Sequence, residues 1–222
     1  MPVITISREF GSGSDDIGAR LAERLGYHFV DKEFIGTLLR EYGLIDFEKE
    51  FETPQGFWDA FNMQRGKRRD LMVGMLNRVV QAVARHGNAV IQGRSGFAIL
   101  ESFADVLHVR LQAPLPVRVE QMMAQQQMSA EQAAVSVKDG DAARRSFVQE
   151  FYGVHWDAIQ AFDLVINIGK VPPNLAMTWV IDAENALALR PATGKPTTRS
   201  IEVDSVLAQA VSARLSCQTA HS

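Results

Sequence analysis

Apolar residues follow two patterns along this chain. Short runs rich in Val and Ile predict buried strands, and longer segments in which apolar residues recur every three or four positions predict amphipathic helices. Strands are expected at 3–6, 27–30, 89–91, 105–111 and 162–168. Helices are expected at 15–25, 32–42, 67–86, 117–127, 172–189 and 201–215. Because strands and helices alternate at this spacing, the pattern predicts an α/β fold, a mostly parallel sheet covered by helices on both faces.

A glycine-rich turn joins the first expected strand to the first expected helix. It consists of Gly11, Ser12, Gly13 and Ser14. Glycines let backbone N–H groups converge without obstruction from Cβ atoms, and the dipole at a helix start attracts anions. This is the layout of a phosphate-binding loop, although a tight turn without a ligand explains the same residues equally well.

The turn departs from the standard pattern of such loops, G-x-x-x-x-G-K-[ST]. Ser14 stands where the pattern has lysine, and Asp15 stands where it has serine or threonine. Asp15 and Asp16 suit the start of a helix, but they would repel a phosphate. If a phosphate binds here, we expect a magnesium ion at Asp15, or arginines from elsewhere, to offset these two carboxylates.

Composition narrows the class of protein. With 222 residues, 46% of them hydrophobic and 22% charged, the chain is consistent with one α/β domain carrying an accessory segment. A net charge of −3 gives no basic field for nonspecific nucleic-acid binding. The single cysteine, Cys217, excludes an internal disulfide and a multi-cysteine zinc site.

The same sequence shows no targeting or membrane signal. The first strand begins too early to leave room for a signal peptide, and no apolar run approaches the roughly 20 residues that span a bilayer. We therefore expect a cytoplasmic protein with no membrane or nucleic-acid partner. A homodimer is compatible with the sequence, which does not fix the oligomeric state.

Aromatic residues gather in a mixed segment at 43–66. The cluster comprises Phe47, Phe51, Phe57, Trp58 and Phe61. Such a segment can cap a pocket or form a satellite core, and the second interpretation is favoured because aromatic clusters are mainly packing devices.

Several motifs, in order, resemble those of the cytidylate kinase-like family, a divergent branch of the P-loop nucleoside monophosphate kinases. They include I-T-I-S-R-E-F-G-S-G-S, F-V-D-K-E-F-I, V-I-Q-G-R-S-G and D-G-D-A-A-R-R. The resemblance covers residues 3–182 and implies a P-loop NTPase-type fold, a three-layer parallel sheet with a helical lid. The core would span 1–189 with its lid at about 129–156, and 190–222 would form a linker and a C-terminal helix or tail.

The resemblance also implies which residues bind the two nucleotides. The 11–14 turn would hold the phosphates of ATP, with Asp15 as the magnesium ligand. Asp31 would open the acceptor-binding segment. A second turn would bind the acceptor monophosphate through Gly93, Arg94 and Gly96, with Ser95 replacing the family's aspartate.

Arginines would supply the positive charge that phosphoryl transfer requires. The family's lid arginines correspond to Arg144 and Arg145, and Arg8 could supply charge in the absence of the lysine. Two of them have a purely structural alternative: Arg8 can form an ion pair with Glu9 or Asp31, and Arg145 can be a solvated charge on a helix.

Three functions are compatible with these residues. The first is an ATP-dependent nucleoside monophosphate kinase with CMP or dCMP as acceptor. The second is a degenerate P-loop module that binds a nucleotide without turnover, and the third is a kinase of another small acceptor. The missing lysine favours the second, whereas a lid that keeps its arginines favours an enzyme, which is the interpretation we prefer.

Overall fold

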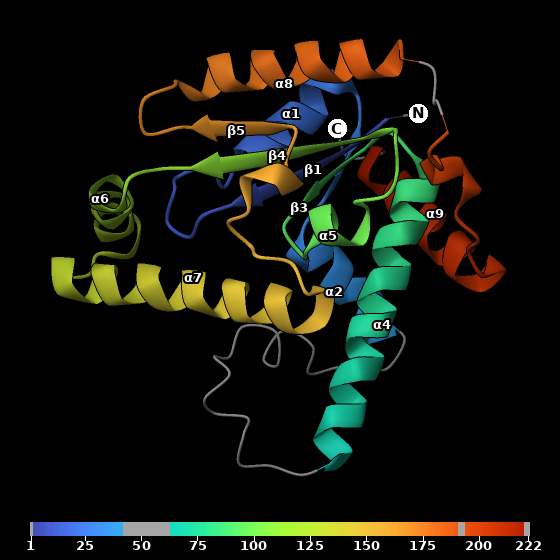
Figure 1. Cartoon of the computed structure of the whole chain (residues 1–222), viewed down its shortest axis with the longest axis horizontal. Coiled ribbons are helices and arrows are strands. Elements are labelled where there is room, and N and C mark those ends of the chain that lie inside the picture. The colour runs from blue at the N-terminus through green and yellow to red at the C-terminus, as the bar shows by residue number, and fades with distance from the viewer. Residues whose placement is uncertain (1, 42–62, 191–193, 220–222) are drawn as a thin grey trace.

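A five-stranded parallel sheet forms the centre of the computed structural model, which describes residues 2–41, 63–190 and 194–219 (Figure 1). For 63–68 and 218–219 it describes the backbone alone. The strand order is β2-β3-β1-β4-β5. The strands are β1 (Val3–Arg8), β2 (His28–Val30), β3 (Ala89–Gln92), β4 (Val106–Gln112) and β5 (Leu164–Asn167). All five predicted strands are confirmed, each with slightly different ends.

β1 lies in the middle of the sheet because its residues are apolar on both sides. Val3 and Ile4 are fully buried, and they pack into different clusters on opposite faces. In register, Ile6 pairs with Gln92 of β3 and Val109 of β4. The turn that follows β1 therefore emerges at the centre of the carboxyl edge of the sheet, where ligands of parallel α/β sheets bind.

Helices cover both faces of the sheet, as predicted. The helices are α1 (Ile17–Leu25), α2 (Lys32–Glu41), α4 (Met63–His86), α5 (Gly96–Ile99), α6 (Leu115–Gln126), α7 (Ala130–Tyr152), α8 (Pro173–Ala188) and α9 (Ser205–Thr219). α1 and α8 lie on one face, whereas α2, α4, α5 and α9 lie on the other (Figure 1). This three-layer arrangement confirms the predicted P-loop type of fold. None of the described helices is both long enough and apolar enough to cross a bilayer.

α6 lies beyond the carboxyl ends of β4 and β5, and α7, which packs on α6, runs from there below the sheet toward α2 and α4 (Figure 1). α6 begins at Leu115, two residues before the predicted start, because proline is tolerated in the first turn of a helix. A capping box, in which Ser129 and Gln132 bond each other's backbone N–H, starts α7.

Residues 129–150 are polar and alanine-rich, from which the sequence predicts a helical arm with a weak apolar face that does not belong to the core. The helix is confirmed as α7, but its exclusion from the core is wrong. Ala133 and Val137 pack against α6, and Phe147 and Val148 join the main core. The segment that the sequence predicts as a lid is therefore mostly one long helix, packed on α6 near its start and on the main core near its end.

The C-terminal segment packs on the domain instead of leaving it. Thr198 donates to both carboxylate oxygens of Asp105, from its N–H and its hydroxyl, each at 2.7 Å. Leu207 and Val211 of α9 are buried in the cluster that contains α4. The aromatic cluster predicted at 43–66 lies outside the residues whose side chains are described.

Candidate functional site

The glycine turn has the backbone of an anion-binding loop. Gly11 and Gly13 have φ of +71° and +69°, a left-handed conformation that glycine adopts without strain. Between and after them, Ser12 and Ser14 are 1% and 0% exposed, and their hydroxyls form a 2.7 Å hydrogen bond. Left-handed residues that alternate with other conformations turn successive N–H groups toward one side, which creates a concave site for an anion.

Several N–H groups of this loop are left for a ligand. Glu9 N–H donates to Leu111 O at 3.1 Å, and Ser12 N–H donates to Glu9 O at 3.3 Å. In contrast, the N–H groups of Gly11, Gly13 and Ser14 have no acceptor within the described part of the chain. Since backbone donors are usually paired, the loop has donors for an anion just before the N-terminus of α1.

Arginines offset the two carboxylates at the start of α1. Arg8 forms an ion pair with Asp15, and Arg20 Nη1 lies 3.1 Å from Asp16 Oδ2. The partner of Arg8 is thus neither Glu9 nor Asp31. Charge compensation by arginines, one of the two routes predicted, is therefore present in the chain itself.

Helix α6 packs directly over the loop glycines. A methyl group at Gly11 would lie 2.7 Å from Met122 Cγ and 3.3 Å from the backbone oxygen of Arg118. At Gly13, it would lie 2.5 Å from Cδ of Gln121. Glycine at both positions therefore allows α6 to approach the loop as well as permitting its backbone conformation.

A buried ion cluster holds α7 to the same loop. Asp141 accepts hydrogen bonds from Phe10 N–H at 3.1 Å and from Arg118 Nη1 at 2.6 Å. Arg118 Nη1 also donates to Phe10 O at 3.3 Å, and its Nε lies 3.6 Å from Glu9 Oε2. The side chains of Arg118 and Asp141 are 10% and 12% exposed, so water screens this pair weakly. The sequence analysis identified neither Arg118 nor Asp141 as a site residue. The one available signal was that Asp141 lies in the motif D-G-D-A-A-R-R.

Arg110 is a second buried cation that sequence reasoning missed. It lies on β4, donates through Nη1 to Trp156 O at 2.8 Å and lies 4.2 Å from the centroid of the Trp156 ring. Its Nη2 is 3.7 Å from Glu9 Oε1. Burial lowers the pKa of Arg110 and the Glu9 carboxylate opposes this shift. Arg110 thus ties the segment after α7 to the sheet beneath the loop.

The structure separates the two predicted lid arginines. Arg144 lies over the ring of Phe10, 4.9 Å from its centroid, and its Nη1 donates to Gly140 O at 2.8 Å. Arg145 is half exposed, and its Nε is 3.8 Å from Asp157 Oδ2. Arg144 is therefore the one placed beside the glycine loop, and Arg145 has the surroundings of a solvated helix charge.

The predicted acceptor turn follows β3 and has an unusual backbone. Gly93 has φ of +78°, and Arg94 and Ser95 also have positive φ, +53° and +56°. Two consecutive non-glycine residues in this region store strain, which in proteins concentrates at functional sites. Arg94 is 7% exposed, and Gly96 starts α5 against Thr5 of β1.

Tyr152 lies close to this turn and bonds α4. The Tyr152 hydroxyl, on the last turn of α7, donates to Asn77 Oδ1 at 2.7 Å, and the Ser95 side chain is near enough to influence its pKa. Burial raises the pKa of Tyr152, and the Ser95 side chain opposes this shift. Tyr152 thus ties the end of α7 to α4 and lies beside the predicted acceptor turn.

Asp31 lies at the carboxyl end of β2 and caps α2. Its Oδ1 accepts N–H groups of Glu33 and Phe34, each at 3.0 Å. Its side chain is half-buried, and its contact with an acceptor stays a prediction.

The described residues contain no cluster of three or more His, Cys, Asp or Glu side chains arranged to hold a metal. Magnesium is usually bound by one or two carboxylates together with phosphate oxygens, and Asp15, with its side chain 55% exposed beside the loop, fits that role.

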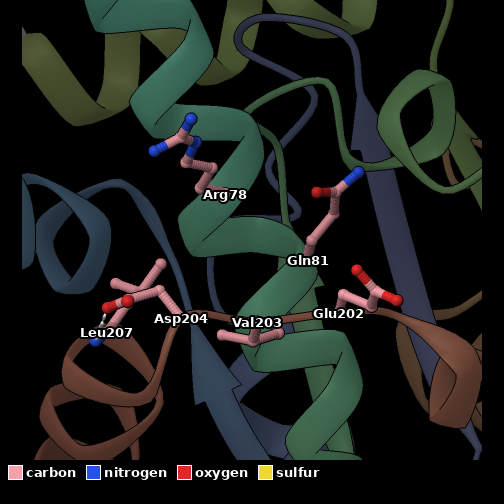
Figure 2. Close-up of a pocket in the computed structure, with 6 residues that line it drawn as sticks. All are labelled: Arg78, Gln81, Glu202, Val203, Asp204 and Leu207. Atoms are coloured by element: carbon pink, nitrogen blue, oxygen red, sulfur yellow. Dashed lines mark hydrogen bonds between the residues drawn. The ribbon is translucent and has the colours of Figure 1, made fainter.

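A pocket of about 340 Å³ lies elsewhere, between α4 and the segment leading into α9. Figure 2 shows its lining, with Arg78 and Gln81 on α4 and Glu202, Val203, Asp204 and Leu207 around α9. None of these belongs to the glycine loop, the 93–96 turn or α7, so the pocket is separate from the candidate site.

Comparison with known proteins finds similar chains along most of the sequence. The model of the cytidylate kinase-like family matches residues 3–170. A cytidylate kinase from Ignicoccus hospitalis is 28% identical over 188 residues, which cover 81% of this chain and 97% of that protein. One from Pyrococcus horikoshii is 27% identical over 171 residues, 77% of this chain and 82% of that protein. Among solved structures, an uncharacterized protein from Eubacterium ventriosum shares the fold, with a TM-score of 0.65 at 19% identity over 84% of this chain and 99% of that one.

Proposed function

Since this chain belongs to the cytidylate kinase-like family, we propose that it catalyses the ATP-dependent phosphorylation of a nucleoside monophosphate, with CMP or dCMP as the preferred acceptor. The archaeal relatives named cytidylate kinase support this choice of acceptor. The observation that carries the proposal is the set of loop N–H groups, at Gly11, Gly13 and Ser14, that have no acceptor in the described residues.

Phosphoryl transfer depends on alignment of donor and acceptor and on positive charge around the transferring group. The loop would hold the donor phosphates at the start of α1. Arg144, already beside Phe10, would contribute positive charge there, with Arg8 and Arg145 as further candidates. Arg94, on its strained turn, would bind the monophosphate of the acceptor with Gly93 and Gly96, next to Asp31.

Magnesium would neutralise part of the phosphate charge when bound. Asp15 would hold it, and its ion pair with Arg8 would then have to loosen. The residues of the chain would do the rest. The loop would bind the donor phosphates, the arginines would orient the transferring phosphoryl group, and α6 and α7 would shield the site from water.

One observation favours a second candidate, a nucleotide-binding module without turnover. Ser14 stands where P-loop kinases have lysine, is fully buried and is bonded to Ser12, so it brings no positive charge to the phosphates. A kinase of another small acceptor differs from the main proposal only in what the 93–96 turn binds.

Nucleotide binding is tested by thermal unfolding. ATP with magnesium at millimolar concentration should raise the Tm, because a ligand that binds only the folded state stabilises it. CMP should raise it further when added to the ATP complex. No change in Tm with either nucleotide, alone or together, would remove both the kinase and the binding module.

A further inference from the structure

Gln121 is the polar side chain that α6 places against the phosphate loop. A methyl group at Gly13 would meet Oε1 of Gln121 first, with Cδ at 2.5 Å and Nε2 at 2.6 Å, so the carboxamide rests on the loop at that glycine with its oxygen nearest. Gln121 is two turns into α6, whose attachment is fixed by Arg118 and Met122 on either side of it in sequence. The carboxamide is therefore held at the loop by a docked helix.

The carboxamide also has an unfilled hydrogen-bonding position. Its Oε1 atom is buried, and it has no hydrogen-bond partner among the described residues. A buried amide atom without a partner costs about 1–3 kcal/mol, so such atoms are uncommon and usually point to a ligand or a water molecule. The two ends of an amide can exchange by a half turn about its last bond, which brings the donor Nε2 to the same place.

The charges around the loop explain why a donor here would matter. Ser14 replaces the lysine and is buried. Arg118, one turn before Gln121, forms an ion pair with Asp141, and Arg8 forms one with Asp15, so the charge of each is already partly neutralised. At Gly13 itself, the three atoms nearest to an added Cβ all belong to the Gln121 amide.

We propose that Gln121 is a ligand of the donor nucleotide's phosphates, donating its amide N–H to a phosphate oxygen bound over Gly13 in place of the absent lysine. This inference rests on the proposed function, because it assumes that the loop binds a nucleotide. The proposal gives α6 a second role: besides packing on the loop, this helix would contribute a side chain that binds the nucleotide phosphates. A neutral donor suits a loop that already carries the ion pairs of Arg8 and Arg20, since it adds a hydrogen bond without adding charge.

The test compares two substitutions of nearly equal size. Gln121→Met keeps the volume and the packing on Gly13 but removes the amide, and Gln121→Glu replaces the donor with an anion. Gln125→Met, one turn further along α6 at an exposed position, is the matched control. Titration calorimetry with ATP and magnesium should show Kd raised about tenfold by Gln121→Met, as expected for loss of a hydrogen bond to a charged group, and raised more by Gln121→Glu. The control should bind like the wild type, and CMP affinity should be unchanged in all three.

The outcomes separate the two proposals. If the wild type binds ATP and Gln121→Met binds it equally well, Gln121 only covers the loop and this inference is overturned while the proposed function stands. If the wild type itself binds no ATP, both are overturned. A melting curve for each variant identifies loss of folding, and Gln121→Ala, which keeps a good helix former, provides a second truncation should Gln121→Met not fold.

Discussion

The docking of α7 on the glycine loop is tested by adding one methyl group at Gly140. Gly140 faces Phe10, and a Cβ at this position would lie 2.7 Å from Phe10 Cγ, 2.9 Å from Cδ1 and 3.1 Å from Cβ. Its φ is not in the left-handed region, so alanine there brings no backbone strain. The substitution therefore sets two effects against each other, a gain in helix propensity and a clash with Phe10.

Their magnitudes predict the sign. Alanine in place of glycine inside a helix stabilises by about 0.5–1 kcal/mol. Overfilling a packed contact costs about 1–3 kcal/mol, and Phe10 cannot simply rotate away because its Cβ is itself within 3.1 Å of the added methyl. Gly140→Ala should therefore destabilise the protein by about 1 kcal/mol. Gly74→Ala on α4 is the control: that glycine is helical, exposed and has no atom within 4 Å of the added Cβ, so its substitution should stabilise by about 0.5–1 kcal/mol.

Urea unfolding followed by circular dichroism measures both changes. In a Phe10→Ala background, Gly140→Ala should destabilise less than in the wild type, because the two ring atoms nearest the added methyl are gone and only the Cβ of residue 10, at 3.1 Å, remains close to it. If Gly140→Ala stabilises the otherwise wild-type protein as much as Gly74→Ala does, Phe10 does not pack on α7 in solution. The docking of α7 on the glycine loop is then refuted.

Three further predictions concern single side chains. Asp141→Asn should destabilise by about 3 kcal/mol, because the buried Arg118 guanidinium loses the carboxylate that it bonds at 2.6 Å and keeps only Glu9, at 3.6 Å. Asp139→Asn on the exposed side of α7 should change little, and equal urea midpoints for the two would dismiss the buried ion pair. Burial lowers the pKa of His108 below its ordinary 6.5, with Asp163 opposing, so the folded state favours the neutral ring: stability should fall as pH drops below about 6.5, since only the unfolded chain takes up the proton there, and His108→Gln should flatten that slope. A slope unchanged in His108→Gln would assign the effect to another group. Arg144→Ala should lower kcat far more than it raises the ATP Kd if Arg144 meets the transferring group; equal losses would place it in binding alone.

Local patterns were sufficient for the elements and for the loop. The β-branched run at 3–6 and the four-residue spacing of Ile17, Leu21 and Leu25 predict a buried strand and an amphipathic helix, and Gly11 and Gly13 mark the turn between them. Each of these signals lies within a few residues of the structure that it specifies.

Contacts between distant segments could not be predicted in this way. Asp141 bonds Phe10 across 131 residues, and neither residue type signals that pairing locally. Gln121 lies between Glu120 and Met122 on α6, and its residue type does not distinguish it from the exposed Gln125; what that part of the helix packs against does. For the same reason, the predicted structural partners of Arg8, Glu9 or Asp31, are wrong. Glu9, Asp15 and Asp16 follow it in sequence and Asp31 ends β2 at the same sheet edge, and the course of the loop decides that Arg8 pairs with Asp15.

Transfer of a labelled γ-phosphoryl group from ATP to CMP is the most direct test of the central claim, that the glycine loop and its arginines serve a nucleoside monophosphate kinase. With magnesium present, we expect labelled CDP to form in step with ADP, faster from CMP or dCMP than from AMP, GMP or UMP, and hardly at all with Arg94→Ala. Absence of a labelled diphosphate from every monophosphate, by a protein that ATP still stabilises, would contradict the kinase and leave a nucleotide-binding module.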